Sequence, residues 1–228
     1  MEDFQIQDDL NLAEMVHADT GPKPPLPGNY MFKPLKWQMR HDKAGKMILW
    51  NNGDGVPTYP ILSLTTAEIV DPIDNARKVV LFQDIPTSPF QREGKTASRA
   101  ADLLIAIDAN AAATNSGEVI RLLSERLNGE IPFRARLDYE GYDKTAAAQF
   151  VSELGPSPDK KAKREAYDKA KIRGYKKIAA SNQKNGQPTL PLHKWVGPSG
   201  NVIECSPVLT VFFPSDETVT LGADKFSK

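Results

Sequence analysis

The chain has 228 residues, 40% of them apolar, and its 29 Lys and Arg balance its 29 Asp and Glu. This content suits one ordinary core, and no stretch reaches the roughly 18 consecutive apolar residues of a membrane span. A single cysteine, Cys205, excludes an internal disulfide and a Cys-rich zinc site, while three scattered histidines argue against a histidine metal cage. We therefore expect no cofactor, no metal and no membrane association.

The N-terminal sequence is acidic and lacks the basic region and apolar stretch of a secretory signal, so we expect a cytoplasmic protein. Residues 1–27 contain six acidic residues before the first lysine, Lys23, and the sequence GPKPPLPG covers residues 21–28. Prolines and glycines at this density forbid regular structure. We therefore predict an acidic flexible arm over 1–27, a folded domain over 28–215 and a short tail over 216–228.

Positive charge is concentrated in one segment of the chain. The segment from Asp159 to Lys184 contains three acidic residues and ten basic ones. The basic residues are Lys160, Lys161, Lys163, Arg164, Lys169, Lys171, Arg173, Lys176, Lys177 and Lys184. A polyanion responds to where charge lies rather than to the total charge. Ala, Lys, Arg and Glu predict a helix over 160–180, although Gly174 weakens it.

The first elements predicted after the N-terminal arm are strands. Residues 30–40 alternate apolar and polar side chains, and Pro34 indicates a bulge or an edge within this strand. A short apolar run follows at 47–50. Two more strands are predicted, one over 61–70 with Leu62, Leu64 and Ile69 in the core, and a strongly apolar one over 78–85.

Two helices follow the third strand. Ser98 is a plausible N-cap for the first, and the second runs from Ser116 or Gly117 to Leu127, before an Asn-Gly pair. Residues 133–140 alternate again and predict the fourth long strand. After the basic segment, short runs between 196 and 213 surround the turn GPSGN and complete the pattern.

Strands that do not alternate one for one with helices favour an α+β or mainly β fold over a doubly wound sheet. A five-stranded oligonucleotide-binding (OB) barrel places its helix between strands three and four, and its loops after strands one and four embrace the ligand. This sequence places helices in the first interval and a basic insertion, 159–184, after the fourth strand. We therefore predict an OB-fold-like barrel.

The order of elements resembles the single-stranded DNA-binding proteins of tailed bacteriophages that carry an elaborated OB fold. The likeness lies in GNYMFKPLKWQM, RKVVLFQDIPT, the block from GKTASRAADLLIAID to IPFRARLDYEGYD, and GNVIECSPVLTVFFPS. The resemblance implies sequence-tolerant coating of single strands during phage replication or recombination, in the host cytoplasm. Some such proteins carry a cysteine zinc ribbon after strand four, where this chain has a basic segment instead.

Single strands are held by cations that follow the phosphates and by aromatic rings that stack on bases. Candidates for phosphate contacts are Lys33, Lys36, Arg40, Arg134 and Arg136 on the strands, with Lys160, Lys161, Lys163, Arg164, Lys171, Arg173, Lys176 and Lys177 in the insertion. Candidates for stacking are Trp37, Trp50, Tyr139, Tyr142 and Trp195. Trp37 shares the parity of Leu35 and Met39, so a core position is an equal alternative for it.

Several alternatives remain open at this point. A run of lysines is commonly a solvated helix face, and the acidic arm is either an ordinary terminus, an intramolecular competitor for the DNA site, or a docking tail for replication or recombination proteins. Asp84 followed by Glu93 and Lys95 fits the spacing of a magnesium-dependent nuclease. A phage structural or accessory protein without a nucleic-acid role also suits the neutral total charge.

Overall fold

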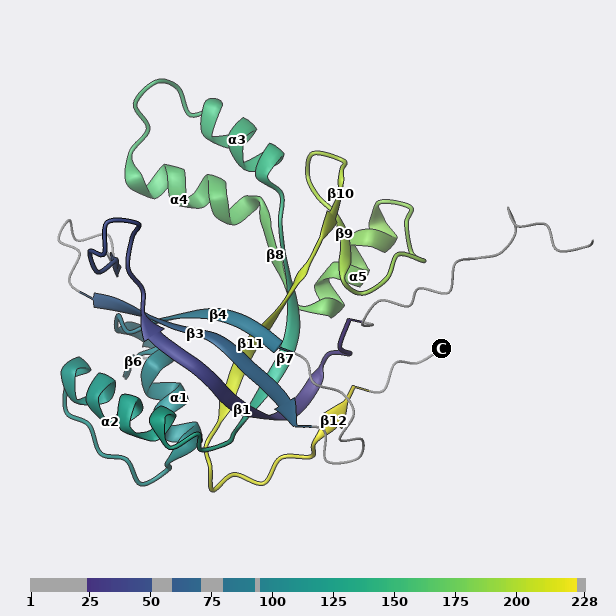
Figure 1. Cartoon of the computed structure of the whole chain (residues 1–228). Coiled ribbons are helices and arrows are strands. Elements are labelled where there is room, and N and C mark those ends of the chain that lie inside the picture. Colours follow the sequence, from purple (N-terminus) through teal and green to yellow (C-terminus); the bar gives the residue numbers. More distant parts are fainter. Residues whose placement is uncertain (1–23, 51–58, 71–79, 93–94, 225–228) are drawn as a thin grey trace, which may run out of the picture.

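The computed structural model describes residues 24–50, 59–70, 80–92 and 95–224. Residues 1–23 of the predicted arm and the turn NNGDG therefore lie outside the described residues, as does Asp71-Pro72, which was predicted to end a strand. Figure 1 shows a curved sheet with two helices below it and a helical excursion above it.

Five long strands form a continuous antiparallel path through the sheet. The order across the sheet is β4 (Val80–Pro86), β3 (Tyr59–Val70), β1 (Gly28–Met39), β7 (Phe133–Tyr142) and β11 (Ser206–Phe213). Short strands extend this path at β3, β7 and β1, namely β2 (Leu49–Trp50), β8 (Lys171–Arg173) and β12 (Gly222–Ala223). All four predicted long strands are present, and the run after GPSGN supplies the fifth, β11.

Strand β1 carries the irregularity predicted from Pro34. Its pairing with β3 shifts register between Pro34 and Lys36 and again between Lys36 and Gln38. Proline has no backbone N–H to donate to a ladder, so a register shift beside it is the expected accommodation. The bulge increases the local twist and helps the sheet to curve.

Strands β4 and β11 are the two ends of the path, and curvature brings them together. Because every neighbouring pair on the path is antiparallel, β4 and β11 run in the same direction. No main-chain ladder joins them in the described part of the chain. Instead, the side-chain amide of Gln83 on β4 bonds to the backbone of Leu209 on β11.

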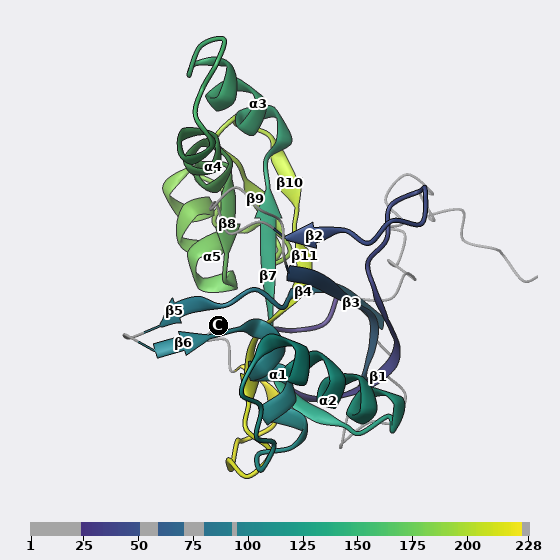
Figure 2. The same cartoon turned by 90° about the vertical axis from the view of Figure 1, so that its left-hand side faces the viewer.

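The main core lies between the inner face of this sheet and two helices, α1 (Arg99–Ile107) and α2 (Ser116–Asn128). Leu103 and Leu123 are fully buried in it, with Phe32 and Phe133 from the sheet; Figure 2 shows the helices against the strands. Both helices are capped as their sequences predict. Ser98 accepts a hydrogen bond from the N–H of Ala101 at 3.0 Å, and Asn115 one from Glu118 at 3.0 Å.

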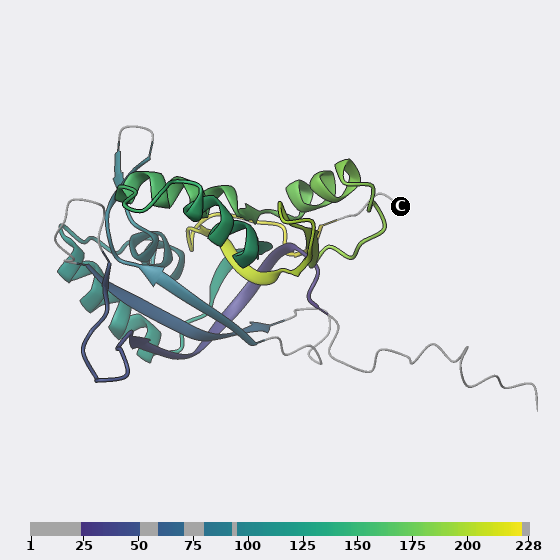
Figure 3. The same ribbon diagram turned by 90° about the horizontal axis from the view of Figure 1, so that it is seen from above.

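The chain between β7 and β11 forms a separate helical excursion with two small cores of its own. It contains α3 (Lys144–Ser152), α4 (Lys160–Lys169), β8, α5 (Tyr175–Lys184) and the hairpin of β9 (Lys194–Val196) with β10 (Val202–Glu204). Figure 3 shows its green helices grouped along one side of the molecule. Helix α3 was not predicted.

The prediction of one helix over 160–180 is wrong. The helix ends at Lys169, residues 171–173 pair with the end of β7, and a new helix begins at Tyr175. Gly174 has φ +101°, a backbone conformation that other residues rarely adopt. The weakness noted at this glycine is therefore a complete break in the helix.

A second small hairpin lies where only a polar connection was predicted, in the stretch after β4. It consists of β5 (Phe90–Arg92) and β6 (Lys95–Ala97). The α+β class with a mostly antiparallel sheet is confirmed. A closed barrel is not found among the described residues, so the OB barrel stays a prediction.

Candidate nucleic-acid interface

The outer face of β4 presents the most exposed large apolar side chain among the described residues, Phe82, which is 70% exposed. Its neighbours on either side point inwards, since Leu81 is buried in the core and Gln83 bonds to β11. Strand alternation explains this arrangement, because Phe82 shares its face with Asp84 rather than with Leu81 and Ile85. The sequence analysis did not propose Phe82 as a binding residue, although this parity was readable.

Cations lie across the same face. The pairing of β4 with β3 shifts register between Leu64 and Ala67, opposite Phe82, and Lys36 of β1 pairs with Thr66 in that irregular stretch. Lys36 and Phe82 therefore flank the same short segment of β3. Arg40, just after β1, forms an ion pair with Asp84, and both side chains are 40% or more exposed.

The helical hairpin of α3 and α4 lies on the side towards which this face points. Leu81 and Ile85 pack with α1 residues in the main core, so the opposite face of β4 points away from α1. Figures 1 and 2 place α4 on the opposite side of β4 from α1, and Figure 2 places β2 on that side too. We call the outer surface of β1, β3 and β4 on this side the β4 face.

Helix α4 is anchored by alanines and leaves its basic residues in solvent. Ala166 is buried, and Ala170 packs with Ala146 and Ala147 in a small core that Tyr142 also contacts. Lys160, Lys161, Lys163 and Arg164 are all exposed, and of these the structure gives an ion pair only to Arg164, with Asp168 at 3.9 Å. Small residues allow close packing of α3 and α4 without using the long basic side chains.

Four of the five predicted strand cations are engaged by described partners, namely Arg40 by Asp84, as described above, and the three that follow. Lys33 pairs with Glu130 at 2.7 Å, and Arg134 donates to the carbonyls of Ser215 and Glu217. Arg136 forms two hydrogen bonds with Asp224, at 2.5 and 3.2 Å. These arginines fasten the chain after β11 to the sheet, which corrects their predicted role.

The predicted stacking residues are mostly covered as well. Tyr139 and Trp195 are 2% and 4% exposed, in the small core beside α5, so neither ring offers a face to a base. Trp37 packs partly buried against the main core, and its indole N–H donates to Asn128 at 3.0 Å. The core alternative for Trp37 is therefore the one observed.

The other two stacking candidates, Tyr142 and Trp50, provide less support for a stacking role. Tyr142 is half-buried against α3, and the ammonium of Lys171 lies 5.5 Å from the centre of its ring. The side chain of Trp50 lies outside the described residues. The aromatic side chain presented most openly by the described strands is thus Phe82.

A basic depression of about 550 Å³ opens at the start of α5, three strands away from β4. We call it the α5 depression; it is lined by Arg136, Asp138, Arg173, Gly174, Tyr175, Lys176, Lys177 and Asp224. Hydrogen bonds from Arg136 hold the pKa of Asp224 below its usual value, and burial raises the pKa of Tyr175. Arg173 is paired with Glu140, which leaves Lys176 and Lys177 as the cations of the lining without an ion pair to another described residue.

A second depression, of about 580 Å³, is lined mainly by amides, glycines and the edge of Trp195, and carries no charged side chain in its lining. Its lining therefore lacks a cation that would attract a phosphate.

Metal chemistry finds no support in the described residues. They contain no group of three or more His, Cys, Asp or Glu side chains that could hold a metal ion. Asp84, the first residue of the nuclease spacing, is engaged by Arg40, while Glu93 and the side chain of Lys95 lie outside the description. Cys205 is buried, and burial raises the pKa of its thiol to about 12.

None of the helices in the described ranges has the length and apolar content needed to cross a membrane. Comparison of the chain with protein-family models, with characterised proteins and with solved structures finds no significant match. The argument for function therefore rests on the geometry of the β4 face and of the basic excursion.

Proposed function

We propose that this protein binds single-stranded DNA, largely without sequence preference and without catalysing a reaction, and protects single strands during phage replication or recombination. The strand would lie on the β4 face, with its phosphates held by Lys36 and by the exposed lysines of α4. The observation that carries this proposal is Phe82, a ring that is 70% exposed on a regular strand and flanked by cations.

Single exposed apolar side chains are ordinary on protein surfaces, so the combination of Phe82 with neighbouring cations, rather than its exposure alone, supports a binding role. A base stacked on such a ring gains about 1–3 kcal/mol, irrespective of its identity, because every base has a π face. Cations beside the ring supply the sequence-independent attraction to phosphates. Together these terms favour a flexible single strand, whose bases are free to turn towards the protein.

The topology supports the same proposal. We propose that β1, β3, β4, β7 and β11 form a partly open OB barrel, with α1 and α2 between its third and fourth strands. The seam of this barrel would lie between β4 and β11, where the amide of Gln83 takes the place of a ladder. In OB folds the face of strands two and three and the loops after strands one and four bind oligonucleotides. In the proposed barrel, the β4 face and the basic excursion would occupy those positions.

Fluorescence anisotropy with a labelled oligo-dT of about 30 nucleotides tests the proposal, at low and moderate salt, with duplex competitor and with EDTA. We expect salt-sensitive binding that survives both additions. Phe82→Ala should weaken it about 5- to 150-fold, which corresponds to the loss of one stacked base, and Phe82→Trp should retain it. Val202→Ala, at a residue 56% exposed on β10, is the matched control and should bind as the parent does.

Absence of binding at low salt would overturn the proposal as a whole. Binding that Phe82→Ala leaves unchanged would remove the β4 face as the site and leave the basic excursion to be tested on its own.

A further inference from the structure

Two of the basic side chains that line the α5 depression form no ion pair with another described residue. Of its four basic side chains, Arg136 is bonded to Asp224, and Arg173 to Glu140 at 2.6 Å. Lys176 and Lys177 stand side by side in the first turn of α5 and form no ion pair with another described residue; the ammonium of Lys176 lies 6.0 Å from the ring of Tyr175. The depression therefore offers the ammonium groups of Lys176 and Lys177, whereas its other two cations, Arg136 and Arg173, are already paired with carboxylates.

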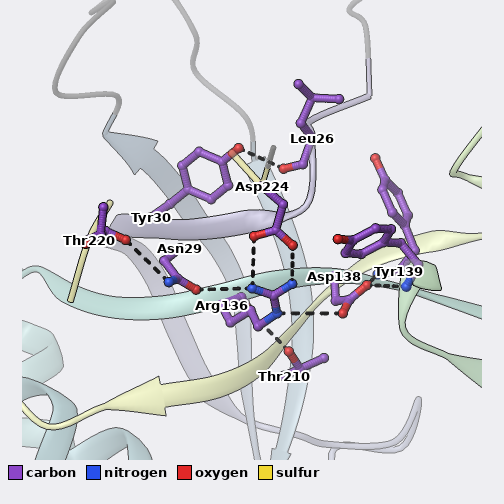
Figure 4. A network of polar contacts seen from close by, with 10 residues as sticks. Leu26, Asn29, Tyr30, Arg136, Asp138, Tyr139, Thr210, Thr220 and Asp224 are labelled. Carbon is purple, nitrogen blue, oxygen red and sulfur yellow. Dashed lines mark hydrogen bonds and ion pairs between the residues drawn. The ribbon is translucent and has the colours of Figure 1, made fainter. Parts of the chain in front are cut away.

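The N-terminal segment joins the fold beside this depression. The hydroxyl of Tyr139 donates to the carbonyl of Pro25 at 2.6 Å, and that of Tyr30 donates to the carbonyl of Leu26 at 2.8 Å. The residue before Tyr139 is Asp138, which lines the depression and accepts a hydrogen bond from the N–H of Tyr175 at 2.6 Å. Figure 4 shows Leu26, Asp224, Arg136 and Asp138 together in this one place.

The segment that begins there has the opposite charge to the two lysines. Residues 1–22 contain Glu2, Asp3, Asp8, Asp9, Glu14 and Asp19, with no Lys or Arg. Four of these carboxylates occur as adjacent pairs, which matches the adjacent pair Lys176 and Lys177. Five residues lead from Asp19 to Pro24, enough to span up to about 16 Å, and the earlier acidic residues reach further.

We propose that the acidic segment 1–22 of the chain docks in the α5 depression, with its carboxylates on Lys176 and Lys177. A tether this short gives an effective concentration in the millimolar range, so individually weak ion pairs suffice to fill the site. A nucleic-acid strand is the less favoured occupant, because the lining of the depression already contains the carboxylates of Asp138 and Asp224. The proposal stands independently of the DNA-binding function.

The test uses full-length protein in which the six acidic residues are neutralised (E2Q, D3N, D8N, D9N, E14Q, D19N), with a fluorescent peptide of residues 1–20 as the probe. We expect the peptide to bind this variant in low salt, and to bind the parent chain at least tenfold more weakly, because the parent's own segment occupies the site. Adding K176Q and K177Q to the neutralised variant should lower peptide affinity at least tenfold. K160Q with K161Q, an adjacent pair on α4 with the same charge, is the matched control and should change it less than twofold.

Equal loss of affinity in the two lysine variants would overturn the assignment to this depression, as would equal peptide binding by the parent and the neutralised chain. Shielding in the parent that appears only as protein concentration rises would overturn docking within one chain in favour of the segment of a second copy. Circular dichroism spectra matching the parent confirm that the substituted chains are folded. Because the probe is a peptide, failure here leaves the oligo-dT result untouched.

Discussion

The side chain of Gln83 forms two hydrogen bonds with the backbone of Leu209, donating from Nε2 to the carbonyl at 3.0 Å and accepting from the N–H at 2.7 Å. An amide side chain carries one donor group and one acceptor, like a peptide unit, so Gln83 supplies both bonds that a neighbouring strand would otherwise make. This residue joins the two ends of the curved sheet.

Replacing Gln83 tests that role. Gln83→Ala leaves the N–H of the buried Leu209 without this acceptor, while its carbonyl keeps the bond from Arg99 at 3.1 Å, so we expect a loss of about 1–3 kcal/mol in the free energy of unfolding. Urea denaturation measures it. Gln38→Ala, an exposed glutamine on β1, should change stability by no more than about 0.5 kcal/mol. Equal effects of the two substitutions would show that the seam is held by something else.

The lysines of α4 should contribute to the salt dependence of DNA binding. Each phosphate contact to a single strand adds about 0.7 to the slope of log affinity against log salt concentration, so K160Q/K161Q/K163Q should reduce that slope by about 2. Titrations of oligo-dT at several salt concentrations measure the slope. Lys33→Gln should leave it unchanged, because Lys33 is already paired with Glu130. An unaltered slope in the triple variant would identify these lysines as a solvated face only.

Asp143 fixes the base of the excursion. It is fully buried, caps α3 through the N–H of Ala146 at 2.9 Å, and accepts from both the N–H and the hydroxyl of Ser199, at 2.9 and 2.6 Å. Burial opposes ionisation, but these hydrogen bonds outweigh it and hold the pKa of Asp143 below its usual value of 3.8. The carboxylate therefore stabilises the fold fully above that usual value, and the stabilisation is lost as pH falls through the lower pKa of the folded state.

Asp143→Asn should destabilise the protein by about 1–3 kcal/mol near neutral pH, because an amide NH₂ cannot accept the bonds from Ser199. It should also flatten the loss of stability in acid, measured by urea denaturation between pH 3 and 7. Asp159→Asn is the control, since Asp159 is an exposed N-cap of α4 and asparagine caps equally well. An unchanged acid dependence in Asp143→Asn would contradict the argument.

Cys205 should be inert towards thiol reagents in the folded protein. Burial, and then the neighbouring carboxylate of Glu204, raise the pKa of its thiol to about 12, so very little thiolate is present at pH 8. We expect its reaction with a disulfide reagent such as DTNB to be at least a hundredfold slower than in urea. Rapid stoichiometric labelling of the folded chain would contradict the observed burial.

The sequence predicted the framework well where one face of an element is buried. Alternation in 30–40 and 133–140 predicted β1 and β7, the N-cap at Ser98 predicted α1, and the Asn-Gly stop predicted the end of α2, because these signals are local. The break between α4 and α5 was missed, since it depends on residues 171–173 pairing with the distant end of β7. Composition favours helix there and tertiary pairing overrides it.

The candidate site was predicted less well, for a related reason. Arg134 and Arg136 looked available on a strand, but their partners come from residues 215–224, which no local pattern connects to β7. Trp195 and Tyr139 resembled stacking residues by type, and their burial depends on how α5 packs. The exposure of Phe82 could have been predicted from the sequence, since the inward position of Leu81 fixes the outward direction of the next side chain.

The place of the excursion in the chain also bears on how the protein folds. Strands β7 and β11 are neighbours in the sheet, yet residues 143–205 separate them along the sequence. Closing so long a loop costs conformational entropy before the hydrogen bonds between β7 and β11 form. Proteins dominated by such distant strand pairings fold slowly. The clamp of Asp143 on Ser199 draws the two ends of this loop together before β11 is reached. An excursion that folds early would therefore hold β11 close to β7 and favour the pairing of these two strands.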